Sequence, residues 1–211
     1  IKSRGLGDVY KRQAQHSQTM YQMMTAVPGL KVVIPSNAYD AKGLLLSAIR
    51  DDDPVLFFEP KALYQETCEV PDEVYTIPLG EAAMPREGDD VTVVAFGQMV
   101  GRAAQAIDGL ESQGISCDLI DPRCTSPLDS ETILESVAAT GRLVVVDESP
   151  PRCGLTADIS AMVCERAFSS LRAPIRQVCA PHSPVPFSPD LEAEYLPSVA
   201  KIQAAIRETL Q

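Results

Sequence analysis

Short apolar segments alternate with amphipathic segments along the chain, a pattern that predicts alternating strands and helices. Residues 17–27 carry apolar side chains three or four positions apart, as on one face of a helix, and Pro28-Gly29 follows as a stop signal. For this first part the pattern predicts a helix over 17–27, a strand over 31–34, a helix from a cap at Ser36 or Asn37 to about Arg50, and a strand over 55–58 that is covered on both faces.

Residues 64–80 interrupt the alternation with two prolines and several acidic residues, as is typical of a linker. A second series follows, in which Gly97 marks a tight strand-to-helix turn and Asp129 can cap a helix. The order indicates the end of one parallel α/β domain followed by a doubly wound parallel sheet. The predicted strands are 91–96, 117–120, 143–146 and 175–179, and the predicted helices are 99–113, 129–139, 155–168 and 198–210.

Composition narrows the possible partners. The chain has 211 residues, 45% of them hydrophobic, with a net charge of −11. A surplus of acidic residues disfavours nucleic acid, because binding phosphates requires clustered Lys and Arg. No apolar run approaches the roughly 20 residues that span a bilayer. Because the N-terminus also shows no secretion signal, we expect a cytoplasmic protein without a membrane partner.

The cysteines and histidines give no zinc pattern, because no CxxC pair occurs and His16 and His182 lie far apart. We expect reduced thiols that serve mostly as small core residues. A nucleophilic cysteine would need an activating base, and the sequence offers no obvious one. The six residues concerned are Cys68, Cys117, Cys124, Cys153, Cys164 and Cys179.

Residues 1–13 differ from the rest of the chain. They contain four basic residues and one acidic residue, a net charge of +3, and they show no helical or strand periodicity. We expect a tail that is disordered or not native to the fold. A targeting peptide is the alternative, but 13 residues are few for one and no cleavage signature follows.

Two features bear on ligand binding. The second α/β series lacks a GxGxxG motif after any strand, since Gly97 and Gly101 are spaced as GxxxG, so a scaffold or contact domain is favoured over a nucleotide site. The run Asp51-Asp52-Asp53 follows the C-terminal end of a predicted helix, where carboxylates oppose the helix dipole. This run is either a solvated acidic turn or a site for a hard cation.

Several motifs carry a resemblance that covers nearly the whole chain. They include AQHSQ (14–18), PGLKVVIPS (28–36), YDAKGLLLSAIRDDDPVLFFEPKALY (39–64), EVYTIPLGEA (73–82), TSPLD (125–129), ATGRLVVVDE (139–148) and APHSPVPFS (180–188). The chain resembles the β subunit of the thiamine-diphosphate-dependent component of 2-oxo acid dehydrogenase complexes. PRCGLTADIS (151–160) and APHSPVPFS look most like acetoin dehydrogenase. The sequence departs from the usual pattern at Pro60, where many relatives have His, and at Pro122 and Cys124 around Arg123.

The resemblance implies a domain order. Residues 14–64 would form the C-terminal part of a transketolase-like pyrimidine-binding domain, 65–80 a linker, and 81–211 a transketolase C-terminal domain. The glutamate that activates the cofactor lies upstream in this family, so we expect a piece lacking that group. It would not hold thiamine diphosphate alone, because the diphosphate and its magnesium are bound by the α subunit.

The resemblance also implies site residues. His16 of the HSQ motif would be catalytic, because imidazole can exchange protons near neutral pH; an ordinary structural histidine is the alternative. Ala48, Ile49, Asp51 and Asp53 would surround a potassium ion, mainly through main-chain oxygens, although position 53 is often Asn.

Three functions remain open at this stage. The first is cleavage of acetoin or of a 2-oxo acid such as pyruvate or a branched-chain acid, with transfer of the acyl group to a lipoyl acyltransferase. The second is a non-catalytic module that assembles with an α subunit, a second β subunit and the acyltransferase core. The third, a flavodoxin-like electron carrier, is disfavoured by the missing phosphate loop.

Overall fold

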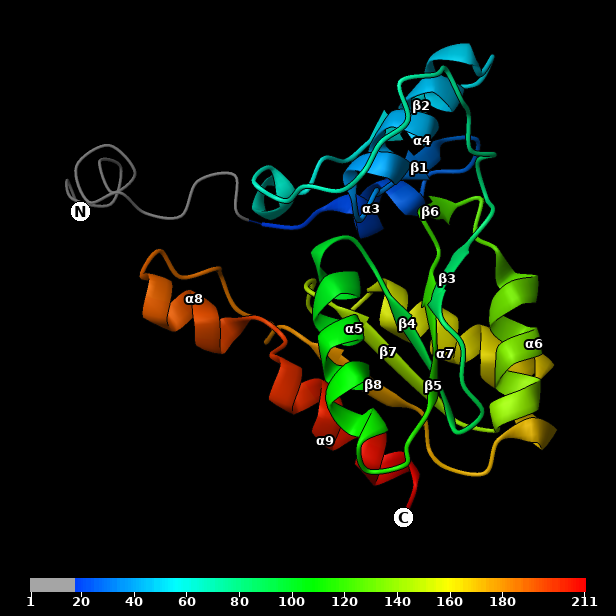
Figure 1. Cartoon of the computed structure of the whole chain (residues 1–211), viewed down its shortest axis with the longest axis vertical. Helices are drawn as coiled ribbons and strands as arrows, with labels where there is room; N and C mark the ends of the chain where they lie inside the picture. The colour runs from blue at the N-terminus through cyan, green and yellow to red at the C-terminus, as the bar shows by residue number, and fades with distance from the viewer. Residues whose placement is uncertain (1–17) are drawn as a thin grey trace.

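Two sheets of unequal size organise the protein in a computed structural model that describes residues 18–211 (Figure 1). The tail predicted over residues 1–13 and the predicted catalytic His16 lie outside the described residues. The larger sheet and its helices occupy the lower half of the view, and the smaller sheet lies above them.

The larger sheet has five strands in the order β3-β5-β4-β7-β8. Four of them are parallel, as predicted, and in the middle of the sheet Val93 aligns with Leu119 on one side and Val144 on the other. The fifth strand, β3, was not predicted and runs antiparallel at the edge. The strands are β3 (Ala83–Arg86), β4 (Val91–Ala95), β5 (Cys117–Asp121), β7 (Leu143–Asp147) and β8 (Arg176–Cys179).

Helices cover both faces of this sheet, which confirms the doubly wound arrangement. On one face α5 and α9 pack against alternate residues of β4, and on the other face α6 and α7 pack against the residues between them. The helices are α5 (Gln98–Glu111), α6 (Ser130–Thr140), α7 (Leu155–Arg166) and α9 (Val199–Thr209), with short helices η2 (Phe168–Ser170) and α8 (Pro189–Tyr195).

The smaller sheet has three strands in the order β2-β1-β6. Its outer strand β2 is parallel to β1, and β6 pairs with β1 on the other side in the antiparallel direction. The prediction that 55–58 is covered on both faces is wrong, because every residue of β2 is only half-buried at the edge of the sheet. The elements are α3 (Tyr21–Thr25), β1 (Lys31–Val33), α4 (Ala38–Arg50), β2 (Val55–Phe57), η1 (Lys61–Leu63) and β6 (Cys124–Ser126).

Local signals place several helix starts correctly. The side chains of Asn37, Asp129 and Ser198 each accept a hydrogen bond from a backbone N–H in the first turn of the helix they precede. Gly97 begins α5 with a φ of 51°, which a residue with a side chain rarely adopts. The helix predicted over 17–27 is shorter, at Tyr21–Thr25.

An interdomain contact joins the two sheets. Arg123 donates a hydrogen bond to Asp40 at 2.7 Å, and their side chains are 14% and 3% exposed, so this ion pair is largely excluded from water. Arg123 N–H also bonds Asp121, whose other carboxyl oxygen accepts from Ser36. Hydrogen bonds and an ion pair therefore hold the segment between β5 and β6 against the start of α4.

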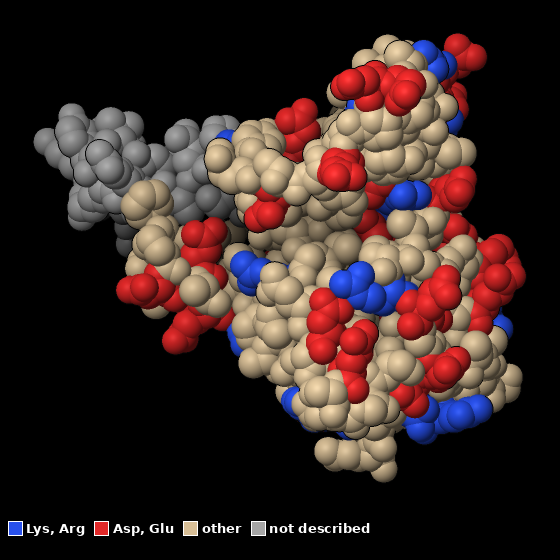
Figure 2. All heavy atoms as spheres, viewed as in Figure 1, with Lys and Arg blue, Asp and Glu red and all other residues tan. Residues whose placement is uncertain are grey.

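The cysteines are free thiols, but the expectation that most lie in the core is wrong, because Cys68, Cys153 and Cys164 are exposed. Acidic side chains spread over both parts of the visible face with fewer basic ones between them, in keeping with the net charge (Figure 2). Within residues 18–211, no helix is both long and apolar enough to cross a membrane.

Candidate functional site

A cleft of about 690 Å³ opens at the carboxyl edge of the five-stranded sheet. Ligands of doubly wound folds bind at this edge, because the loops after the parallel strands meet there. Both halves of the protein contribute to it. The lining residues are Gln18, Thr19, Met20, Tyr21, Ile34, Phe58, Glu59, Pro60, Lys61, Ala62, Gln98, Glu148, Pro184, Val185 and Glu192.

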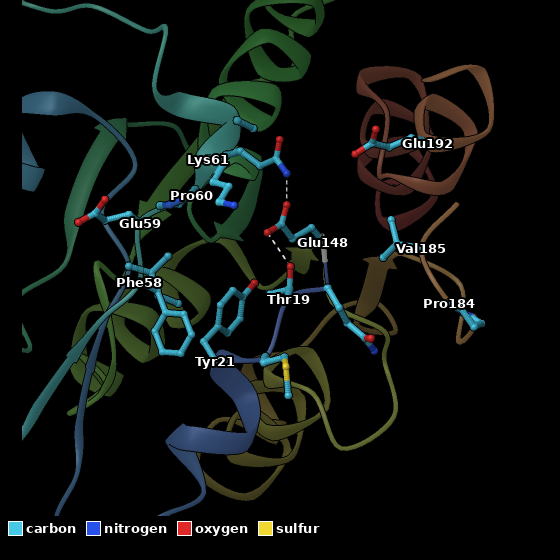
Figure 3. A pocket seen from close by; sticks show the side chains of 15 residues that line it. Thr19, Tyr21, Phe58, Glu59, Pro60, Lys61, Glu148, Pro184, Val185 and Glu192 are labelled. Atoms are coloured by element: carbon cyan, nitrogen blue, oxygen red, sulfur yellow. Dashed lines mark hydrogen bonds between the residues drawn. The ribbon is translucent and has the colours of Figure 1, made fainter. Parts of the chain in front are cut away.

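Glu148 forms the polar centre of the cleft (Figure 3). One carboxyl oxygen accepts a hydrogen bond from the Thr19 hydroxyl at 2.8 Å, and the other accepts from the side-chain amide of Gln98. Burial raises the pKa of Glu148, although the bonds from Gln98 and Thr19 oppose that rise. Figure 3 shows Glu148 and Thr19 between the side formed by Phe58 to Lys61 and the side formed by Val185 and Glu192.

The neighbouring carboxyl group of Asp147 is fully buried beneath the cleft. It accepts hydrogen bonds from the hydroxyls of Tyr21 and Ser149. Burial raises the pKa of Asp147, and burial followed by the nearby carboxylates raises the pKa of Tyr21. The Tyr21 ring also meets Phe58 edge to face, with 6.0 Å between ring centres. The segment entering α3 is thus held on one side by a carboxyl group and on the other by an aromatic ring.

The charges around the cleft are mainly negative. Glu59, Glu148 and Glu192 line it, against one basic side chain, Lys61. A diphosphate group needs several cationic or N–H donors. The described residues of the cleft therefore do not fit the diphosphate of the cofactor that the resemblance implies, although the apolar side chains of Ile34 and Phe58 offer a surface for an uncharged group.

The acidic turn after α4 lies elsewhere and already has a cationic partner. Lys31 places its ammonium group 2.8 Å from Asp51 and 3.0 Å from Asp53. The hydrogen bond from Lys31 lowers the pKa of Asp51. No pattern in the sequence indicates this pairing, because Lys31 lies 20 positions from Asp51.

The potassium site predicted at this turn remains a prediction. Ile49 is 71% exposed, and Ala48 is half-buried. Across residues 18–211, no group of three or more His, Cys, Asp or Glu side chains could hold a metal ion. Any potassium here would depend on main-chain oxygens, as the resemblance implies.

Sequence reasoning missed the residues that form the cleft, although they leave a signal. Polar residues at the end of a buried strand or directly after it, such as Asp147 at the end of β7 and Glu148 after it, mark the carboxyl edge of a sheet. Gln98 carries the same signal after β4 and Gly97. His16 lies outside the described residues, but Gln18 and Thr19, from the same segment, line the cleft.

Two family models match the chain. The model described as "Transketolase, C-terminal domain" matches residues 80–202, and the one described as "Transketolase, pyrimidine binding domain" matches residues 6–67. Together they cover both sheets, apart from the short segment between them.

Curated relatives match over nearly the whole chain. It is 53% identical over 98% of its length to the β subunit of acetoin:2,6-dichlorophenolindophenol oxidoreductase from Cupriavidus necator, and 50% identical over 97% to that of Bacillus subtilis. The pyruvate dehydrogenase E1 component subunit beta of Bacillus subtilis is 45% identical over 93% of the chain. The chain spans 61%, 60% and 60% of the lengths of these three relatives.

A solved structure supports the same fold. A split gene transketolase, described as an inactive beta4 tetramer, superposes with a TM-score of 0.73 over 90% of this chain and 60% of that one. Because the two sequences are 23% identical, this likeness concerns the fold alone.

Proposed function

The chain belongs to the transketolase family, and from that premise we propose that it is part of the β subunit of a thiamine-diphosphate-dependent acetoin or 2-oxo acid dehydrogenase. The enzyme would cleave its substrate and pass the acyl group to a lipoyl acyltransferase. The observation that carries the proposal is the cleft at the carboxyl edge of the larger sheet, which is lined by Gln18, the last residue of the HSQ motif, and by the next residue, Thr19.

Acetoin is the preferred substrate within this proposal. The acetoin-oxidising relatives are 53% and 50% identical to the chain, against 42% to 46% for pyruvate and 2-oxoisovalerate relatives. The cleft supports this order, because Glu59, Glu148 and Glu192 would repel the carboxylate of a 2-oxo acid more than neutral acetoin. Pyruvate and branched-chain 2-oxo acids are the alternatives.

Thiamine diphosphate would supply the carbanion chemistry of such a reaction. The diphosphate and its magnesium would be held by an α subunit, because Lys61 is the only basic side chain that lines the described cleft. This chain would contribute His16 as a catalytic residue that exchanges a proton with the reacting substrate.

The proposal also includes the remaining partners and ions. An α subunit, a second β subunit and a lipoyl acyltransferase core would complete the assembly, and the cytoplasm is the expected compartment. The carbonyl groups of Ala48, Ile49 and Asp51, with Asp53 close by, would hold a potassium ion that orders the end of α4.

The test uses the complete polypeptide assembled with its α subunit. We expect reduction of an artificial electron acceptor with acetoin, and slower reduction with pyruvate. His16→Ala should lower turnover by about 10²–10⁴-fold while the assembly stays intact. The exposed His182, which does not line the cleft, is the matched control. His182→Ala should keep turnover within about twofold of the parent.

Two outcomes would count against these assignments. Assembly without turnover on acetoin or any 2-oxo acid would contradict the enzymatic proposal and leave the non-catalytic assembly role. Equal turnover in the two histidine variants would show that His16 is an ordinary structural residue and not a catalytic one.

A further inference from the structure

Side-chain hydrogen bonds attach α3 and the residues just before it to the C-terminal domain. Thr19 bonds Glu148 at 2.8 Å, Tyr21 bonds Asp147, and Thr25 bonds Thr125 at 2.6 Å. Of these three attachments, the bond from Thr19 is the one closest in sequence to His16, and both of its partners line the cleft.

The carboxyl group of Glu148 is well suited to join two elements. A carboxylate has two oxygens that accept hydrogen bonds without donating any. Glu148 uses one for Thr19 and the other for Gln98 in the first turn of α5, so it links the segment entering α3 to a rigid helix.

The other end of this link is itself held firmly. Gly97 turns directly from β4 into α5 with φ 51°, and a Cβ there would lie 3.2 Å from Ile34 and 3.3 Å from Pro60. The close approach sets where Gln98 lies relative to the smaller sheet. Contacts therefore run from the core of the C-terminal domain to the residues before α3, through Gly97, Gln98, Glu148 and Thr19.

Keeping glutamate in this place has a cost that docking alone does not explain. Its side chain is half-buried and hydrogen-bonded to two neutral donors, and burial raises its pKa, so a neutral side chain would be less costly in this place. A structural anchor for α3 already exists in the pair of Tyr21 and the fully buried Asp147. The bond from Glu148 adds control over the part of the segment nearer the cleft.

We propose that Glu148 is a positioning residue: by accepting the hydrogen bond from Thr19 it fixes Thr19 against the C-terminal domain, and so limits the positions open to the catalytic residue three places earlier in the chain. The inference rests on the proposed function of His16. Thr19 is three residues along the chain from His16, so fixing one restricts the positions open to the other. Misplacing a reacting group by about 1 Å can lower the rate on the order of 100-fold.

The kinetic test uses the complete polypeptide in its α-subunit assembly, with acetoin as substrate. Thr19→Val removes the hydroxyl while keeping the shape of the side chain, and Glu148→Ala removes its partner. Each should lower kcat by about 10- to 100-fold with KM within about threefold. The double variant should lose no more than either single variant, because both changes break the same contact.

Two further variants separate positioning from general damage. Thr19→Ser restores the hydroxyl and should recover most of the kcat lost in Thr19→Val. Thr25→Val is the matched control, since it makes the same change within the same segment at a hydroxyl that does not line the cleft. It should keep kcat within about twofold of the parent.

Hydrogen exchange of the present 211-residue chain gives an independent readout. The backbone amide of Met23, whose N–H donates to the carbonyl of Met20 at 3.1 Å, should exchange about tenfold faster or more in Thr19→Val and Glu148→Ala, and within about threefold of the parent rate in Thr25→Val. This measurement needs no turnover, and it reports on the contact itself.

The possible failures are distinguishable. A parent assembly that turns over neither acetoin nor any 2-oxo acid overturns the proposed function, and the positioning role falls with it. An active parent whose kcat stays within threefold in both Thr19→Val and Glu148→Ala overturns the positioning role alone. Additive losses in the double variant, or unchanged exchange of the Met23 amide, also contradict it.

Discussion

The two sheets differ in how far each is complete by itself. In the larger sheet every residue of β4, β5 and β7 is buried, and helices cover both faces. In the smaller sheet β2 is only half-buried along its length, and the third strand, β6, comes from the segment between β5 and α6 of the other domain. The larger sheet builds its own core, whereas the smaller one is completed by its neighbour.

Apolar packing and an ion pair hold the smaller sheet against the larger one. One core cluster includes Tyr21, Val32 and Ile34 of the first region together with Val94 and Val145 of the second. The ion pair of Arg123 with Asp40 adds a charged contact across the same boundary. We therefore expect changes at the boundary to destabilise the first region more than equivalent changes elsewhere on the surface.

Breaking the ion pair at the boundary should have the largest effect. Asp40→Ala leaves the guanidinium of Arg123 largely buried without a carboxylate partner, and should lower the free energy of unfolding by about 3–5 kcal/mol. The matched control is Asp108→Ala, which breaks the exposed pair with Arg86 and should cost at most about 1 kcal/mol. Urea unfolding of both variants measures the difference, and equal costs would show that the boundary has no special weight.

The pH dependence of stability tests the same boundary through Asp121. Burial raises the pKa of Asp121 from an ordinary value of 3.8 to about 7, against the opposing bonds from Ser36 and the N–H of Arg123. A raised carboxyl pKa means that the folded state favours the protonated form. This contribution to stability is therefore complete below pH 3.8 and is lost as the pH rises through about 7.

Asp121→Asn should remove this dependence, because the amide does not ionise. Relative to the variant, the parent should lose a few kcal/mol of stability as the pH rises from 3.8 to about 7, at about 1.4 kcal/mol for each pH unit, with little further change above that range. Asp40 and Arg123 face the same group, so the measurement compares parent and variant at each pH and not the parent alone. Parallel stability curves for the two proteins would contradict the prediction.

If a cation binds at the end of α4, the stability of the smaller sheet should depend on that ion as well as on contacts with the larger sheet. If potassium binds there, the melting temperature of the α-subunit assembly should be higher in potassium than in sodium or tetramethylammonium at equal ionic strength. The gain should approach about 2.7 kcal/mol at a hundredfold excess over the dissociation constant. An Asp51→Ala, Asp53→Ala double variant should lose it. Identical melting in the three salts would leave the turn neutralised by Lys31 alone.

Removing helix caps should give the smallest losses of stability, and it compares one cap in each of the two regions. Asn37→Ala at the start of α4 should cost about 1 kcal/mol, because the bond from the backbone N–H of Asp40 is lost together with the amide's bonds to the Asp40 carboxyl group and to Ser36. Asp129→Ala at the start of α6 should cost more, up to about 2 kcal/mol, because Asp129 also accepts from the N–H of Ala82. Thermal unfolding of both variants checks the order, and a larger loss for Asn37→Ala would reverse it.

The sequence by itself determined most of the larger sheet. Mostly apolar runs such as 91–96 and 143–146 indicate strands covered on both faces, and the caps at Asn37, Asp129 and Ser198 need only nearby backbone groups. The motifs also indicated the family that the domain matches confirm. These elements can be predicted from the sequence because each signal depends on residues within a few positions of one another.

Only the tertiary structure decided the strands β3 and β6 and the side-chain contacts between residues that are distant in sequence. The strand β6 has three residues and β3 contains Pro85, so neither shows a strand period, and each forms only because a partner strand lies beside it. Lys31 meets Asp51 across 20 positions, and Thr19 meets Glu148 across 129. Local periodicity and capping carry no information about such distant partners, because the free energy of each contact arises only after the two domains have brought its groups together.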